Sequence, residues 1–244
     1  MVIKATVPGS GSGTVSGSLS FNPLHSNHRA GLLLQNGIVT IAWGSYCDHF
    51  PYHGWMISYS ASTLAQLGVL NTTPNGSGGD VWMGGAGLAA GANSRIYLAT
   101  GNGDENASLE WGDSILQLSG PASGSFAVSD WFTPYDQQPL GVNDWDLAAG
   151  AVLILPNLPS GQQLLVQASK KGTIYLIDRN EMGKYCSTCT STSGDTQIVQ
   201  ELPHALSGMW GASLLERERV LRWSLLRRQL RGQQVEGFLI QCEQ

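Results

Sequence analysis

Apolar residues in this chain gather in short runs, and the runs recur in sets along the sequence. Each set opens on a short phrase whose second member is Gly, at residues 30–33, 86–89, 149–152 and 210–213. In the first three sets, a second apolar run lies at 38–42, 96–100 and 164–168, and a third at 55–59, 114–118 and 173–177. A weaker fourth run closes the units, as at 63–70 and 126–132. Runs of this length, rich in branched and aromatic residues, predict β-strands.

Four short strands per unit, repeated along the chain, are the signature of a propeller blade. One blade cannot bury both of its faces, so neighbouring blades must stack. The sequence therefore predicts an all-β fold: a partial β-propeller of about three four-stranded blades in an open arc. Inner strands should lie near Leu32, Leu88 and Val152 and face one axis. The blades are expected at roughly 28–76, 77–134 and 145–205.

The two ends of the sequence differ from this central region, residues 28–213. Residues 4–7 resemble the outer strand of a preceding blade, so we expect residues 1–27 to form that strand and a linker. The tail, residues 214–244, holds six Arg and four Glu, net +2, whereas the rest, with seven Lys or Arg and fourteen Asp or Glu, carries −7.

Two interpretations stay open for this tail. It is either a genuine basic helix, with a leucine face, or a stretch that is frameshifted or mispredicted. We favour the second, because codons permitted by residues 215–223 also encode a blade-like strand in another frame. We therefore expect an internal fragment of a larger ring, with the remaining blades of the parent chain as its partners.

Composition narrows the classes of function. The abundant Gly, 31 of 244 residues, and a charged fraction of 13% suit tight turns between strands. A net charge of −5 argues against nucleic acid as a partner. No apolar run approaches the ~20 residues that span a membrane. Residues 1–5 lack the apolar core of a signal peptide, so we expect none in this chain.

The spacing of the cysteines and histidines gives little support for a metal-binding site. Cys186 and Cys189 have the spacing of half a zinc site, but no second pair accompanies them. A local disulfide or two free thiols are the interpretations that remain. His49 and His53 beside Asp48 could suggest a metal, and the polarity of a surface loop explains them equally well.

One motif reads Gly172-Thr-Ile-Tyr-Leu-Ile-Asp178-Arg179 and follows Val166-Gln-Ala-Ser-Lys-Lys171. It resembles the repeat of pyrroloquinoline-quinone (PQQ) propellers, in particular that of quinoprotein alcohol dehydrogenases. Phe132-Thr-Pro-Tyr-Asp136 with Asn143-Asp-Trp-Asp146 resembles the Thr-Pro-His-Asp…Trp-Asp segment of those enzymes. Gly78-Gly-Asp-Val-Trp82 and Ile96-Tyr-Leu-Ala-Thr-Gly-Asn102 resemble successive segments, so the resemblance covers roughly residues 30–212.

The resemblance implies a cofactor site on the propeller axis, with PQQ and Ca²⁺ in the full-length parent. By position, Trp82 matches the ring that stacks on the quinone, and Lys170 matches the basic residue that touches it. Asn102 matches a calcium ligand, and Asp113 matches the catalytic base and a further calcium candidate. Each also has a structural alternative: Trp82 in packing, Asn102 and Asp113 in turns, and Lys170 at a solvated hairpin tip.

Departures from the family pattern leave two functions open. The expected calcium-binding Glu is missing from residues 44–49, where Asp48 could substitute, and the family's docking phrase is replaced at 59–63. We therefore expect a non-catalytic binding or scaffold module, periplasmic or extracellular by resemblance. The alternative is a fragment of a PQQ- and calcium-dependent alcohol dehydrogenase.

Overall fold

A computed structural model describes residues 2–92, 94–122, 124–211, 214–216 and 239–241. The chain divides into two compact units, Met1–Ala212 and Ser213–Gln244. Within the described residues, helix is confined to α1 (Gln137–Val142) and a 3-10 turn (Leu147–Ala149). The prediction of an all-β fold is confirmed. No helix among the described residues has the length and apolar character to cross a membrane.

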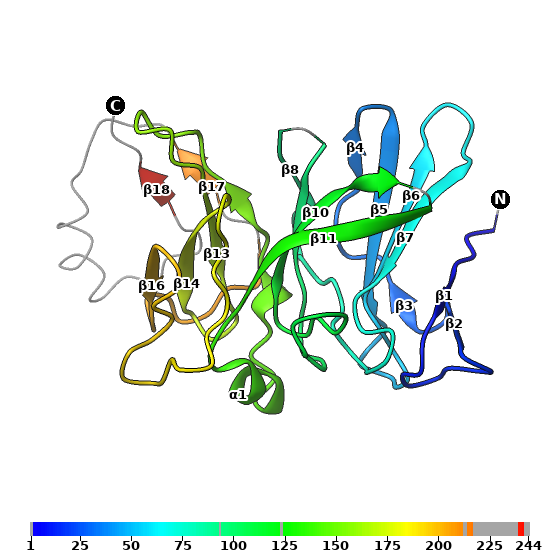
Figure 1. The fold of residues 1–244 in the computed structure, drawn as a ribbon, viewed down its shortest axis with the longest axis horizontal. Helices are drawn as coiled ribbons and strands as arrows, with labels where there is room; N and C mark the ends of the chain where they lie inside the picture. The colour runs from blue at the N-terminus through cyan, green and yellow to red at the C-terminus, as the bar shows by residue number, and fades with distance from the viewer. Residues whose placement is uncertain (1, 93, 123, 212–213, 217–238, 242–244) are drawn as a thin grey trace. The chain divides into compact units, whose positions relative to one another are not determined.

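Three groups of four antiparallel strands form where the repeats predict them (Figure 1). The first group contains β4 (Leu33–Gln35), β5 (Ile38–Ser45), β6 (Trp55–Ser60) and β7 (Gln66–Asn71). The second contains β8 (Ala89–Ala90), β9 (Ile96–Ala99), β10 (Ile115–Ala122) and β11 (Gly124–Thr133). The third contains β12 (Leu153–Ile154), β13 (Leu164–Ala168), β14 (Ile174–Asp178) and β16 (Gln200–Leu202). Each group has the strand order of one blade.

Small residues at the start of each group let the innermost strands approach closely. The backbone N–H of Gly31 donates to the carbonyl of Ala86 at 2.7 Å. A Cβ on Gly87 would lie 2.7 Å from the carbonyl oxygen of Gly31. A Cβ on Gly150 would lie 3.0 Å from the oxygen of Gly211, so the fourth phrase approaches the third in the same way. At Gly87 and Gly150, glycine is therefore a requirement of backbone contact between neighbouring groups.

The outer strands of the first two groups are also joined. Gly124 and Ser125 of β11 pair in parallel with Gly68 and Val69 of β7, and Figure 1 shows β11 running across to reach it. A Cβ on Gly68 would lie 2.6 Å from Pro121, so the missing side chain makes room for this contact. The parallel pairing links both groups into one ten-stranded sheet, which the repeat pattern did not predict.

The N-terminal segment packs on the first group. β1 (Thr6–Pro8) and β2 (Ser18–Ser20) form a two-stranded sheet, and β3 (Ser26–Asn27) pairs with β5. Leu19 and Phe21 are buried against Trp43 and Trp55 in a separate apolar cluster. The main core lies between the three groups, with Phe132 and Tyr175 rings 5.3 Å apart across two of them.

In the second unit, β17 (Leu214–Glu216) pairs in parallel with β18 (Leu239–Gln241). The two interpretations of the tail, a basic helix or a shifted frame, depend on residues 217–238. These lie outside the described residues, so the nature of the tail stays a prediction.

Candidate functional site

A cavity of about 180 Å³ lies where loops from all three strand groups converge. Three of the residues nominated from the sequence line it: Asp48, Trp82 and Lys170. The other lining residues are Arg29, Asp144, Asp146, Ala149 and Trp210. We call this cavity the axial pocket.

Backbone hydrogen bonds bring the contributing loops together. The Gly101 N–H donates to the Asp80 carbonyl at 2.8 Å, and the Met83 N–H donates to the Ala148 carbonyl at 2.8 Å. The Lys170 N–H donates to the Asp146 carbonyl at 3.0 Å. Segments far apart in the sequence therefore meet at one site.

Lys170 is paired with two carboxylates. Its Nζ lies 2.7 Å from Asp144 Oδ2 and 3.3 Å from Asp146 Oδ2. Burial alone would lower the pKa of Lys170, but the hydrogen bond to Asp144 and the charges of both carboxylates outweigh burial and raise it. Lys170 is therefore a charged ammonium at neutral pH, and its charge is balanced within the protein.

Asn102 lies beside this ion pair. Its Nδ2 donates to Asp144 Oδ1 at 3.0 Å, and its backbone N–H donates to Asp146 Oδ1 at 3.3 Å. Its Oδ1 is buried and has no hydrogen-bond partner in the described structure. Asn102 and Lys170 thus share Asp144 as a partner.

Two buried carboxylates flank Gly101. A Cβ on Gly101 would lie 2.7 Å from Asp80 Oδ1 and 2.7 Å from Asp146 Oδ1, so only Gly fits between them. Burial, then the charge of Asp146, raises the pKa of Asp80 well above its usual range. Burial also raises the pKa of Asp146, although the Asn102 N–H and Lys170 oppose it.

Asp80 and Asp146 were not nominated as site residues. Both lie in segments that resemble the quinoprotein enzymes, so the signal was present in the sequence. Asp80 comes two residues before Trp82, and Asp146 ends the Trp-Asp segment. Neither residue could be chosen over its neighbours until the loops were placed in space.

Asp113 lies behind the pocket and supports its backbone. Its side chain is fully buried, and Oδ1 accepts a hydrogen bond from the Leu147 N–H at 3.0 Å. Its φ of 43° is in the left-handed region, and its own N–H donates to the Gly101 carbonyl. Burial raises the pKa of Asp113 well above its usual range. The residue positions both Gly101 and the turn that carries Asp146.

The calcium candidates are directed to different partners. Asp48 Oδ1 accepts from Ser45 Oγ at 2.7 Å, Asn102 Nδ2 donates to Asp144, and Asp113 Oδ1 accepts from the Leu147 N–H. Asn102 Oδ1 and Asp113 Oδ2 have no hydrogen-bond partner in the described structure. His53 bonds to Thr73 Oγ1 and to the Ser12 carbonyl. Among the described residues, no group of three or more His, Cys, Asp or Glu is arranged to hold a metal ion.

The ring face of Trp82 is covered by a cation. The guanidinium carbon of Arg29 lies 4.7 Å from the ring centroid, a cation–π geometry. The edge of the ring packs close to Gly44 and Gly101. Trp82 therefore both packs against the core and offers an aromatic surface to the pocket.

Comparison with solved structures identifies this architecture. Quinohemoprotein alcohol dehydrogenase ADHIIG from Pseudomonas putida HK5 aligns with a TM-score of 0.54 and 16% identity, over 77% of this chain and 30% of that one. The chain has a quinoprotein-type propeller fold. It spans about 30% of the length of that dehydrogenase.

Two further structures are similar. One is quinohemoprotein alcohol dehydrogenase from Comamonas testosteroni, with a TM-score of 0.47, 17% identity and coverage of 63% of this chain and 27% of that one. The other is a europium-containing methanol dehydrogenase, with a TM-score of 0.48, 16% identity and coverage of 76% of this chain and 36% of that one. No family model matches the sequence. No curated protein matches it either.

The quinoprotein-type fold implies PQQ and Ca²⁺, and the axial pocket fits this pair poorly. Trp82 and Lys170 would suit a flat tricarboxylate, but Arg29 covers the ring and Lys170 is bound to Asp144 and Asp146. Three carboxylates face the cavity against two cations, which repels an anionic ligand. The described residues also provide no three-carboxylate or histidine cluster for a metal ion.

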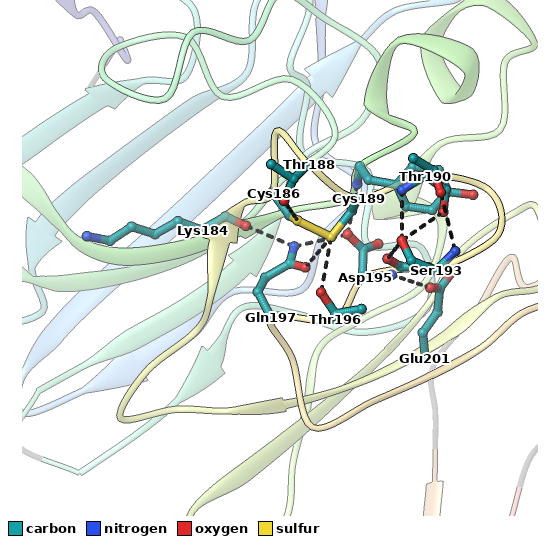
Figure 2. Close-up of a disulfide and its surroundings, with 12 residues drawn as sticks. Lys184, Cys186, Thr188, Cys189, Thr190, Ser193, Asp195, Thr196, Gln197 and Glu201 are labelled. Atoms are coloured by element: carbon teal, nitrogen blue, oxygen red, sulfur yellow. Dashed lines mark hydrogen bonds between the residues drawn. A yellow bond between two sulfur atoms is a disulfide. The ribbon is translucent and has the colours of Figure 1, made fainter.

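Cys186 and Cys189 form a disulfide in the loop between β15 (Lys184–Tyr185) and β16, which decides between the alternatives left by their spacing. Figure 2 shows Gln197 beside it. Gln197 Nε2 donates to Asp195 Oδ1 at 3.0 Å, and Asp195 Oδ1 accepts from the Tyr135 N–H at 2.9 Å. The loop is thereby held against the end of β11. Cys47 is an exposed free thiol.

Proposed function

We propose that this chain is a ligand-binding, non-catalytic segment of an exported propeller protein, and that the axial pocket is its ligand site. The observation that supports this most directly is the pairing of Lys170 with Asp144 and Asp146. The cation that would hold a quinone carboxylate is already neutralised. In the parent protein, the remaining blades would be its structural partners, and its location would be periplasmic or extracellular.

PQQ would have to compete with interactions that the pocket residues already make with one another. A quinone carboxylate reaching Lys170 must replace two carboxylates at 2.7 and 3.3 Å while lying beside them. A quinone ring stacking on Trp82 must displace the Arg29 guanidinium. Both exchanges replace an existing interaction by a similar one, so little free energy remains to bind and orient the cofactor.

A second candidate function is a segment of a PQQ- and calcium-dependent alcohol dehydrogenase. It is favoured by the convergence of Trp82, Asn102 and Lys170 around one pocket, with Asp146 among them. The unpartnered, buried Asn102 Oδ1 is the kind of oxygen that a cation would satisfy. Asp113, turned toward Leu147, would then act as a positioning residue.

Isothermal titration of the 244-residue chain with PQQ in Ca²⁺ buffer distinguishes the two functions. We expect no saturable binding below a dissociation constant on the order of 1 mM. Micromolar or tighter binding, with quinone absorbance and dye reduction by alcohols, would overturn the non-catalytic proposal. An EDTA-treated sample is the control for calcium.

A further inference from the structure

The axial pocket combines an aromatic face with an excess of negative charge. Asp48, Asp144 and Asp146 line it, against Arg29 and Lys170. In the described structure, Asp48 has no ion-pair partner, and Asp144 is mostly exposed. Carboxylates beside an indole ring are the chemistry that recognises an organic cation, not an anion.

The protein already places such a cation on this surface. Arg29 is exposed, and its guanidinium makes no ion pair or hydrogen bond with the described residues. Its contact with the pocket is the face of Trp82, at 4.7 Å. A Cβ on Gly84 would lie 3.5 Å from Arg29 Nη2, so the guanidinium also borders this glycine. Among the described residues, the cation–π contact with Trp82 is thus the interaction that a ligand would have to replace.

We propose that the axial pocket binds a small organic cation, a guanidinium or alkylammonium group, which takes the place of Arg29 on Trp82 and is balanced by Asp48, Asp144 and Asp146. This inference rests on the proposed function, because it assigns a ligand class to the same pocket.

Charge and size both support this ligand class. When Arg29 swings away, three carboxylates face the single ammonium of Lys170, and the ligand restores the balance. A cavity of about 180 Å³ has room for about six waters, which suits a guanidinium or a short alkylammonium group. Two ring systems, Trp82 and Trp210, border this space.

The test compares ethylguanidinium with ethylurea, a neutral analogue of matched shape, by isothermal titration of the full chain at low ionic strength. We expect ethylguanidinium to bind at least tenfold more tightly and to weaken as salt is added. Equal affinity for both compounds would overturn the inference.

Substitution of Arg29 gives a second test, because removal of this side chain should strengthen the binding of a cation that competes with it for Trp82. Arg29→Ala should raise the affinity for ethylguanidinium about three- to sixfold, since an internal competitor is removed. Arg95→Ala, which removes another exposed arginine outside the pocket, is the matched control and should leave affinity unchanged. Asp144→Asn should weaken binding. Weaker binding in Arg29→Ala would contradict the inference.

Failure of this inference is distinguishable from failure of the proposed function. If neither ethylguanidinium nor PQQ with Ca²⁺ binds, the organic-cation inference is overturned and the non-catalytic proposal stands. If PQQ with Ca²⁺ binds tightly and Arg29→Ala weakens it, both are overturned. Circular dichroism of each variant shows whether it has kept its fold.

Discussion

The pKa values of several carboxyl groups in this protein are set more by burial than by hydrogen-bond or charge partners. Burial is the largest influence on Asp80, Asp113, Asp146 and Asp195, and it raises the pKa of all four. Asp80 Oδ1, Asp113 Oδ2 and Asp195 Oδ2 lack hydrogen-bond partners in the described structure. An unpartnered buried carboxylate disfavours its ionised form, so these groups make stability depend on pH.

Asp195 gives a measurable case. Burial raises its pKa from 3.8 to about 7; hydrogen bonds from Gln197 and the Tyr135 N–H oppose this, and the charges of Glu201 and Asp136 add to it. The Asp195 carboxyl has a pKa of 3.8 in the unfolded chain and about 7 in the folded one. Its contribution to the free energy of unfolding is therefore fully present below about pH 4 and is lost as the pH rises to about 7. The loss is at most about 4 kcal/mol.

Asp195→Asn should therefore flatten the pH dependence of stability between about pH 4 and 7 and raise stability at pH 8. Asn retains the oxygen that accepts from Tyr135 and Gln197. Urea unfolding across this pH range measures the effect. Asp104→Asn, at an exposed position, is the control. An unchanged slope in Asp195→Asn would show that another group titrates.

At the scale of elements, the contacts between innermost strands depend on glycine. Gly87→Ala should destabilise the protein by about 1–3 kcal/mol, because its Cβ would lie 2.7 Å from the Gly31 carbonyl oxygen, and backbone must move. Gly211→Ala is the matched control, since nothing lies within 4 Å of its Cβ position. Thermal unfolding of both variants tests whether the close approach at Gly87 requires glycine, and equal losses would argue against it.

The disulfide between Cys186 and Cys189 also stabilises the structure at the scale of elements. Replacing Cys186 and Cys189 by Ser should lower the free energy of unfolding by about 2 kcal/mol, the chain-entropy value for so short a loop. Hydrogen exchange should increase first at the Tyr135 amide, because this N–H donates a hydrogen bond to Asp195 of the same loop. Cys47→Ser, at an exposed free thiol, is the control and should change neither quantity.

For the whole molecule, the three strand groups and both apolar clusters lie in the unit Met1–Ala212. A chain ending at residue 212 should therefore unfold cooperatively at a temperature within about 2 °C of the full chain, since it keeps all the buried apolar surface of this unit. Differential scanning calorimetry of both chains measures this. A loss of cooperativity on truncation would show that the tail contributes to the core.

The axial pocket was predicted only in part. Trp82, Asn102 and Lys170 could be nominated because their segments resemble a known family, and they do come together. Asp80 and Asp146 were missed, and Asp113 was nominated but faces Leu147. The direction of a side chain in a loop depends on backbone torsions such as the φ of 43° at Asp113, which no local pattern specifies.

The sequence by itself determined the strands, their grouping in fours and the blade-like order, because short apolar runs and the turn residues between them are local properties that repeat along the chain. Tertiary structure alone decided the parallel pairing of β7 with β11, the disulfide's hydrogen-bonded route to Tyr135, and the guanidinium of Arg29 on Trp82. Arg29 and Trp82 are 53 residues apart in number, and no local interaction predicts that they touch. Such contacts arise only when separate blades stack, because packing brings together side chains that share no sequence period.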